Sequence, residues 1–206
     1  PHLKKEMEVS IKAGEIVGKI YDALLPLYEA AMNDGNKKEL LHSLNMLCVR
    51  LVFCLYAEDA GIFGRKDMFG DFLKRLEPRD MRSRLIELFK ILDTKPENRD
   101  PFLDDDLAQF PYVNGGLFIH CDGNIPQFTD KLKDLLVNKA SYDFDWSDIS
   151  PTIFGAVFES TLNPETRRSG GMHYTSIENI HKVIDPLFMD SLTAEFPEIA
   201  SIRHIK

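Results

Sequence analysis

The sequence is short of cysteine and has no apolar segment of membrane-spanning length. Its 206 residues include three cysteines, Cys48, Cys54 and Cys121, and none of them shows the C-x-x-C spacing of a zinc or redox site. An odd number of scattered thiols is typical of a reduced, cytoplasmic protein and argues against a disulfide framework. The longest apolar run, residues 46–57, is too short to cross a bilayer and contains Arg50. We therefore expect no membrane association.

Positive charge is also scarce. The net charge is −8, which excludes a globally basic nucleic-acid-binding protein. Residues 100–150 account for most of it, with ten aspartates against three lysines, so the rest of the chain can still carry local basic patches. The densest patch comprises Lys74, Arg75, Arg79, Arg82 and Arg84. It is either a solvated helix face or a face that contacts DNA phosphates, since phosphate contacts need only suitably spaced positive charge.

Recognisable catalytic arrangements are missing as well. The six histidines form no Ser-His-Asp or Cys-His pattern, and no pair of acids with an E-x-K lysine marks a nuclease. Glu58 and Asp59 are adjacent carboxylates, but adjacent helix positions point about 100° apart and no further residue has the spacing of a metal ligand. We therefore expect no metal. Because a buried charge must be paired, Arg50 and Glu58 are expected to form a structural salt bridge.

The composition that remains favours helices around an aromatic core. Hydrophobic residues make up 44% of the chain and include 14 phenylalanines. Helical periodicity predicts helices over residues 3–32, 37–60, 67–76, 79–93 and 129–139, and the second of these is apolar nearly all round. Periodicity is lost over 94–128, where Asn114-Gly115 is a turn signal that suits a hairpin. We predict a mainly α fold, an irregular bundle of seven to nine helices with room for a small β-hairpin near residues 112–128.

The stretch from Ser150 to Phe188 has the pattern of a helix, a basic loop and a second helix. Ser150 and Pro151 suit the start of the first helix, and the proline of Asn163-Pro164 ends it. The capping box T-S-I-E at residues 175–178 predicts the start of the second helix. Free backbone N–H groups at a helix start can bind anions or polar cofactors, although most such loops are only connectors.

Specific runs in this region resemble a known enzyme family. Residues 167–176 read R-R-S-G-G-M-H-Y-T-S, and residues 146–151 and 153–155 read W-S-D-I-S-P and I-F-G. Together they resemble adenine-specific DNA methyltransferases, and more closely the large single-chain restriction–modification enzymes of types IIL and IIG. The run F-P-Y-V-N-G-G-L-F at residues 110–118 resembles a recurrent spacer element of the same proteins. The resemblance implies a helical spacer over residues 1–145. Residues 146–206 are then the helices and G-x-H-Y-T loop at the entrance of a methyltransferase domain.

The resemblance also implies roles for loop residues. Tyr174 and Thr175 border S-adenosylmethionine in the parent protein, with His173 shaping the loop, while Arg167 and Arg168 approach the phosphates of double-stranded DNA. The competing interpretation is that the first three merely pack or cap and that the arginines are ordinary solvated side chains. The family's glycine-rich cofactor motif and its Asn-Pro-Pro-Tyr motif do not occur here. We therefore expect the chain to be a segment that is inactive alone, from a parent with site-specific adenine methyltransferase and endonuclease activity.

Two functions from different classes follow. In the first, the chain is a spacer that positions the nuclease and methyltransferase domains of the same chain, contacts the DNA backbone and contributes one edge of the cofactor site. In the second, it is a non-catalytic helical scaffold that binds protein partners.

Overall fold

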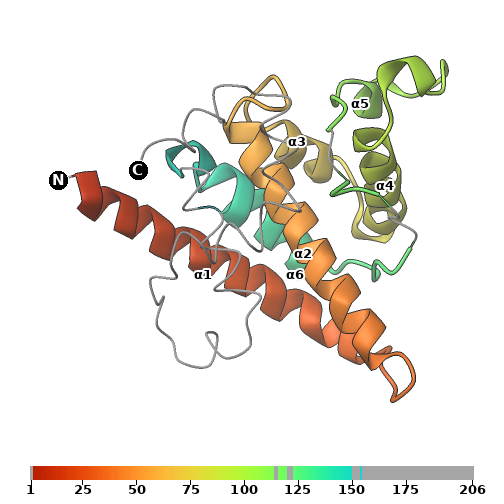
Figure 1. The fold of residues 1–206 in the computed structure, drawn as a ribbon, viewed down its shortest axis with the longest axis horizontal. Helices are drawn as coiled ribbons and strands as arrows, with labels where there is room; N and C mark the ends of the chain where they lie inside the picture. Colours follow the sequence, from red (N-terminus) through yellow and green to blue (C-terminus); the bar gives the residue numbers. More distant parts are fainter. Residues whose placement is uncertain (1, 114–115, 120–122, 150–153, 155–206) are drawn as a thin grey trace.

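Two long helices form the frame of the molecule. The computed structural model describes residues 2–113, 116–119, 123–149 and 154. Helix α1 (His2–Glu29) and helix α2 (Lys37–Asp59) are joined by a short turn and lie side by side in opposite directions (Figure 1). The side chain of Asn33 closes the turn by accepting hydrogen bonds from the backbone N–H groups of Gly35 and Asn36. The predicted helices over residues 3–32 and 37–60 are therefore confirmed.

Helix α2 is the centre of the core. Every residue from Leu51 to Glu58 is buried, as the apolar pattern predicted. By length and composition alone this helix could cross a membrane, but 67% of its most apolar window is buried inside the protein. Burial in the protein interior accounts for its composition. Gly61, with a φ of 80°, follows the end of the helix in the conformation that glycine adopts most readily.

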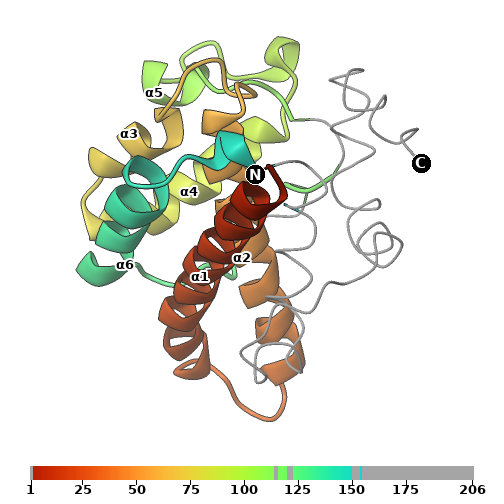
Figure 2. The same cartoon turned by 90° about the vertical axis from the view of Figure 1, so that its left-hand side faces the viewer.

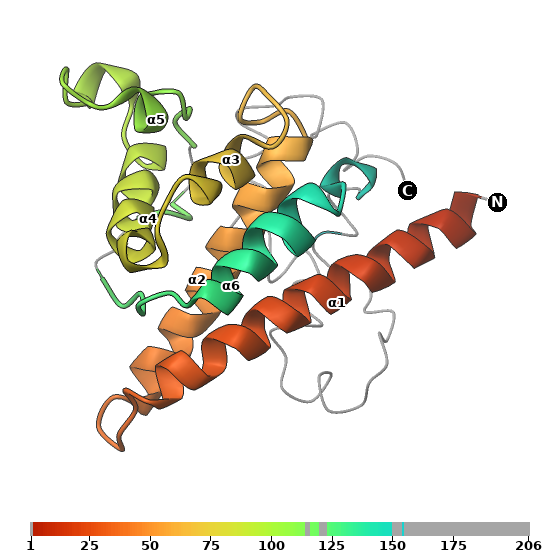
Figure 3. The same cartoon turned by 180° about the vertical axis from the view of Figure 1, so that it is seen from behind.

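The smaller helices pack around this frame. Helices α3 (Met68–Lys74) and α4 (Pro78–Leu92) follow α2, and the short α5 (Asp105–Ala108) packs on α4 (Figures 1 and 2). Helix α6 (Asp130–Asp134) continues into the π-helix η2 (Leu135–Tyr142), which contacts both α1 and α3 (Figure 3). Two 3₁₀ turns, η1 (Pro96–Asn98) and η3 (Trp146–Asp148), complete the described elements. The predicted mainly α fold is confirmed.

Phenylalanine rings of the segment after α5 pack against phenylalanine rings of the helical core. The ring centroid of Phe110 lies 5.2 Å from that of Phe63 and 5.6 Å from that of Phe72. At the other end of the segment, the ring of Phe118 lies 5.7 Å from that of Phe53. All three contacts are edge-on, the geometry that aromatic pairs prefer. The phenylalanines at the two ends of the spacer-like run, Phe110 and Phe118, are thus part of the core.

The hairpin expected near residues 112–128 is absent from the described part of that stretch, which contains no strand. Its backbone groups have other partners instead. The guanidinium of Arg50 donates to the carbonyl oxygens of Leu117 and Ile119, at 2.8 and 3.0 Å. The N–H of Val113 donates to the carbonyl oxygen of Leu92 at the end of α4. With these groups engaged by side chains and a helix end, they are not available to a two-stranded ladder.

Candidate functional site

The residues assigned to cofactor and DNA by resemblance lie outside the described residues. They are His173, Tyr174, Thr175, Arg167 and Arg168. Two other groups that the sequence singled out lie within the helical body, namely the basic cluster around α4 and the adjacent carboxylates at the end of α2.

Acidic partners neutralise part of the basic cluster. Arg84 lies 2.7 Å from a carboxylate oxygen of Glu87 and 3.0 Å from one of Asp104. The hydrogen bond from Arg84 holds the pKa of Asp104 below its usual range. Arg75 forms an ion pair with Asp106. The acidic residues at the start of α5 therefore pair with two arginines of the cluster, although the side chain of Arg75 remains 51% exposed.

A third arginine of the cluster holds the chain in place. The guanidinium of Arg82 donates to the carbonyl oxygens of Ile125 and Gly123, at 2.7 and 2.9 Å. Arg79, by contrast, keeps 84% of its side chain exposed. Three of the five cations of the cluster, Arg75, Arg82 and Arg84, already form ion pairs or hydrogen bonds within the protein. The structure therefore does not favour α4 as a face that binds DNA phosphates.

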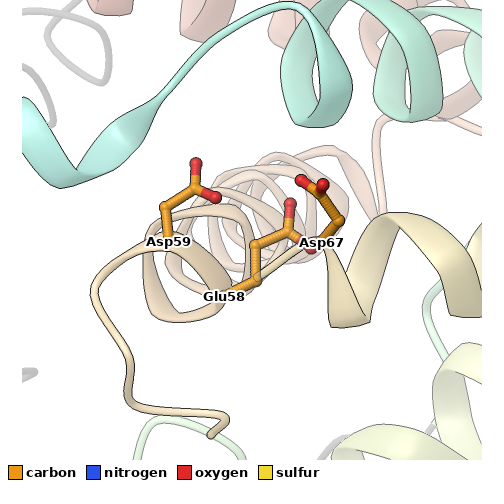
Figure 4. Close-up of side chains that lie close together, drawn as sticks. All are labelled: Glu58, Asp59 and Asp67. Atoms are coloured by element: carbon orange, nitrogen blue, oxygen red, sulfur yellow. The ribbon is translucent and has the colours of Figure 1, made fainter. Parts of the chain in front are cut away.

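Three carboxylates gather where α2 ends and α3 begins (Figure 4). One oxygen of each of Glu58, Asp59 and Asp67 lies within 4.8 Å of the other two. Asp67 joins the cluster because its backbone is left-handed, with a φ of 58°, a conformation that Asp and Asn adopt more readily than most residues. This third carboxylate was not expected from the sequence. Sequence spacing alone carries no sign of Asp67, since its place depends on this one backbone conformation.

Glu58 is the most buried member, with 1% of its surface exposed. Its Oε2 accepts a hydrogen bond from the N–H of Gly70 at 2.9 Å, and its Oε1 accepts one from the hydroxyl of Ser141 at 2.6 Å. The expected salt bridge with Arg50 is wrong, because Arg50 binds backbone carbonyl groups. Eight residues along a helix correspond to roughly 12 Å, which is too far for the two side chains to pair.

Burial shifts the titration of two of these acids. Desolvation raises the pKa of Glu58 to about 7, and the neighbouring carboxylates of Asp59 and Asp67 add to the rise. Desolvation likewise raises the pKa of Asp59 to about 6, although its Oδ2 accepts a hydrogen bond from the N–H of Trp146 at 2.9 Å. Near neutral pH the cluster therefore binds protons that free carboxylates would have released.

The cluster contains the ligand type that calcium and magnesium prefer, but three of its six carboxylate oxygens already accept hydrogen bonds. Both oxygens of Glu58 and one of Asp59 accept hydrogen bonds from the protein. Within the described residues, Oδ1 of Asp59 and Oδ1 of Asp67 are buried without a hydrogen-bond donor. Calcium takes about six to eight oxygen ligands, so we assign no cation to this arrangement. Its contacts instead connect the end of α2 to α3, η2 and η3.

Comparison with known proteins gives consistent matches. Residues 42–118 match the family described as MmeI, helicase spacer domain. Over 196 residues, 94% of this chain, the sequence is 35% identical to DNA methyltransferase A of Bacillus subtilis (strain 168). The fold is similar to that of the type IIL restriction–modification enzyme MmeI, solved in complex with DNA, with a TM-score of 0.62 and 38% identity over 92% of this chain.

The matched regions agree with the architecture. Residues 42–118 contain most of α2, all of α3 to α5 and the segment that ends with the buried Phe118. The chain spans 21% of the Bacillus subtilis protein and 24% of the solved MmeI chain. The resemblance drawn from the sequence motifs is thereby confirmed: the chain is similar to the MmeI-like restriction–modification enzymes, and residues 42–118 match their helicase spacer domain.

Proposed function

We propose that the chain is the helical spacer of a larger cytoplasmic protein with adenine-specific DNA methyltransferase and endonuclease activity. In this proposal it fixes the separation of the nuclease and methyltransferase domains, contacts the DNA backbone and contributes one edge of the S-adenosylmethionine site. The observation that carries the proposal is the similarity of 92% of the chain to an enzyme of this class solved with DNA.

The helical body has the physical properties that a spacer needs. Helix α1 has 28 residues and so extends over roughly 42 Å, comparable to the size of a small domain. Helix α2 packs along it, and a continuous core links both to the remaining described helices. A packed interior resists deformation, so two domains attached to this body would keep a set distance.

The proposed DNA contacts predict a change in salt dependence. Replacing Arg167 and Arg168 together by alanine in the parent protein should weaken DNA binding equally for all sequences. The slope of log K against log salt should fall by roughly one for each phosphate that an arginine no longer neutralises. Fluorescence anisotropy at several salt concentrations measures both quantities. Arg79→Ala is the matched control, because it removes an exposed arginine of α4 that the proposal does not use.

An unchanged salt slope in the double variant, with the fold retained, would remove these two arginines from the DNA interface. If the parent also showed no affinity for DNA, the alternative of a scaffold that binds only proteins would replace the proposal.

The proposed cofactor edge predicts weaker binding of S-adenosylmethionine. Replacing Tyr174 and Thr175 by alanine in the parent should raise the dissociation constant by about tenfold, since a hydrogen bond contributes about 1 kcal/mol net. Isothermal titration calorimetry measures the constant, and circular dichroism checks that the helices remain. Thr175→Ser is the control, because it keeps the hydroxyl group that can both cap a helix and contact a ligand. Wild-type affinity in the folded double variant contradicts the assignment.

A further inference from the structure

Four separate elements meet at the carboxylate cluster of Glu58, Asp59 and Asp67. Glu58 and Asp59 end α2, and Asp67 directly precedes α3 (Figure 4). Hydrogen bonds to the cluster come from Gly70 on α3, from the Ser141 hydroxyl on η2 and from the backbone N–H of Trp146 on η3. The state of these three carboxylates therefore bears on how α3, η2 and η3 are held to the end of α2.

Nearby cations are paired with other acids. Lys66 lies 3.1 Å from Asp145, with 60% of its side chain exposed, and Arg65 lies 2.7 Å from Asp71. From η2, Tyr142 donates its hydroxyl proton to Asp71, and its pKa is raised to about 12, first by desolvation and then by that bond, so it stays neutral. Lys66 also lowers the pKa of Asp59, but its exposed side chain is hydrogen-bonded to Asp145 and does not cancel the rise caused by desolvation.

On the side of α1 the charges are paired as well. Lys5 lies 3.5 Å from Asp148 of η3, and half or more of each side chain is exposed. Solvent screens this pair, so it offers little compensation to the buried carboxylates.

We propose that the Glu58–Asp59–Asp67 cluster is a proton-dependent latch within the spacer. A proton held by Glu58 or Asp59 at mildly acidic pH keeps α3, η2 and η3 against the end of α2, and its loss at alkaline pH loosens this junction. The proposal concerns the spacer alone and does not depend on its role toward DNA.

The physical basis is the burial of like charges. Oxygens within 4.8 Å of one another repel when all three groups are ionised, and the burial of Glu58 limits the screening by water. Oδ1 of Asp59 and Oδ1 of Asp67 are buried without a donor among the described residues, so no hydrogen bond offsets the charge there. The bonds from Gly70 and Ser141 do favour ionised Glu58, but desolvation outweighs them, and the pKa is raised. Deprotonation of Glu58 therefore disfavours the packing of α3, η2 and η3 against the end of α2.

Hydrogen exchange of the full 206-residue chain tests the latch. Amide exchange is measured by mass spectrometry at about pH 6 and about pH 8.5 and corrected for the intrinsic rate at each pH. Peptides covering residues 66–72 and 141–147 contain the amides of Gly70 and Trp146 that donate to the cluster. Their protection should fall by about tenfold or more at the higher pH, since one pKa unit corresponds to a factor of ten. A peptide within α4, which donates no bond to the cluster, should change far less.

Glu58→Gln should abolish most of this dependence, and Asp67→Asn should reduce it. Glu58→Gln removes the charge but keeps an acceptor for Gly70 and a donor for the Ser141 oxygen. Asp67→Asn also removes a charge, and asparagine tolerates the positive φ at this position. Asp143→Asn is the control, because that carboxylate is 59% exposed, is paired with Lys139 and lies outside the cluster.

Protection at both peptides that stays high at alkaline pH in the wild type would overturn the proposal. So would a wild-type pH dependence that persists in Glu58→Gln, or that disappears equally in Asp143→Asn. Should Glu58→Gln fail to fold, Asp67→Asn decides instead, since within the described residues its Oδ1 accepts no hydrogen bond that the substitution could break. With one neighbouring charge removed, the loss of protection at the higher pH should be smaller than in the wild type, and an unchanged loss would overturn the proposal.

Discussion

Replacing Trp146 by alanine is expected to lower the free energy of unfolding by about 3–5 kcal/mol. The side chain is completely buried, and its ring packs edge-on against Phe144 at a centroid distance of 4.9 Å. Its Nε1–H donates to the carbonyl oxygen of Ala140 at 2.7 Å. Alanine would leave a large cavity and an unsatisfied buried carbonyl group together. Urea denaturation followed by circular dichroism measures the decrease, because the variant has no tryptophan left to report by fluorescence.

Trp146→Phe separates the two contributions. It keeps an aromatic ring against Phe144 but removes the donor to Ala140. We expect a smaller decrease, about 1–3 kcal/mol, from the unsatisfied carbonyl and the reduced volume. A decrease below about 1 kcal/mol in Trp146→Ala would contradict the burial of this side chain, since fully buried tryptophans cost far more to truncate.

The features that the sequence predicts correctly depend on neighbouring residues. The apolar pattern of residues 37–60 identifies the central helix because a helix surrounded by protein needs apolar groups on every side. Thr129 directly precedes the helical pattern and is a residue type that caps helices, and its hydroxyl oxygen accepts a hydrogen bond from the N–H of Leu132. The only tryptophan of the sequence is completely buried, as expected of so large an apolar side chain. Each of these inferences needs only the local chain and the rule that apolar groups are buried.

The incorrect predictions have a different cause, because they concern contacts between residues that are far apart in the sequence. Arg50 is expected to pair with Glu58 but reaches backbone carbonyls 67 and 69 residues away. These hydrogen bonds from Arg50 engage two carbonyl groups in the stretch for which the sequence suggested a small hairpin. Asp67 lies near Glu58 because its backbone is left-handed. A glycine usually marks such a conformation in a sequence, and here the residue is an aspartate. One of these errors is avoidable, because helix geometry alone excludes a pair eight residues apart.

The carboxylate junction also explains a glycine whose role the sequence does not reveal. Gly70 lies within α3, where alanine would ordinarily be the better helix former. A Cβ atom at this position would lie 2.1 Å from Oγ and 2.9 Å from Cβ of Ser141. The hydroxyl of Ser141 cannot simply rotate away, because it donates to Glu58. The absence of a side chain at residue 70 is therefore what allows α3 to approach η2 so closely.

Gly70→Ala is accordingly expected to destabilise the protein by about 2–4 kcal/mol. Overpacking contributes about 1–3 kcal/mol, and weakening of the bond from Ser141 to Glu58 adds to it, against a gain of up to about 1 kcal/mol in helix propensity. Gly18→Ala is the matched control, because a Cβ on that glycine of α1 meets nothing within 4 Å. Only the propensity gain applies there, so the control should be stabilised by about 0.5–1 kcal/mol. Urea denaturation of both variants gives the comparison.

A double-mutant cycle then identifies the clash as the cause. Ser141→Gly removes both atoms that a Cβ at residue 70 would strike, and the next nearest atom is 3.4 Å away on Tyr142. In the Ser141→Gly background, Gly70→Ala should therefore cost about 1 kcal/mol or less, which corresponds to a favourable coupling of about 1–3 kcal/mol. If the two substitutions are additive instead, the destabilisation in Gly70→Ala arises elsewhere and the close approach of α3 to η2 does not limit stability. If the cost falls to nearly nothing, the absent side chain at residue 70 is what permits the contact on which the carboxylate junction depends.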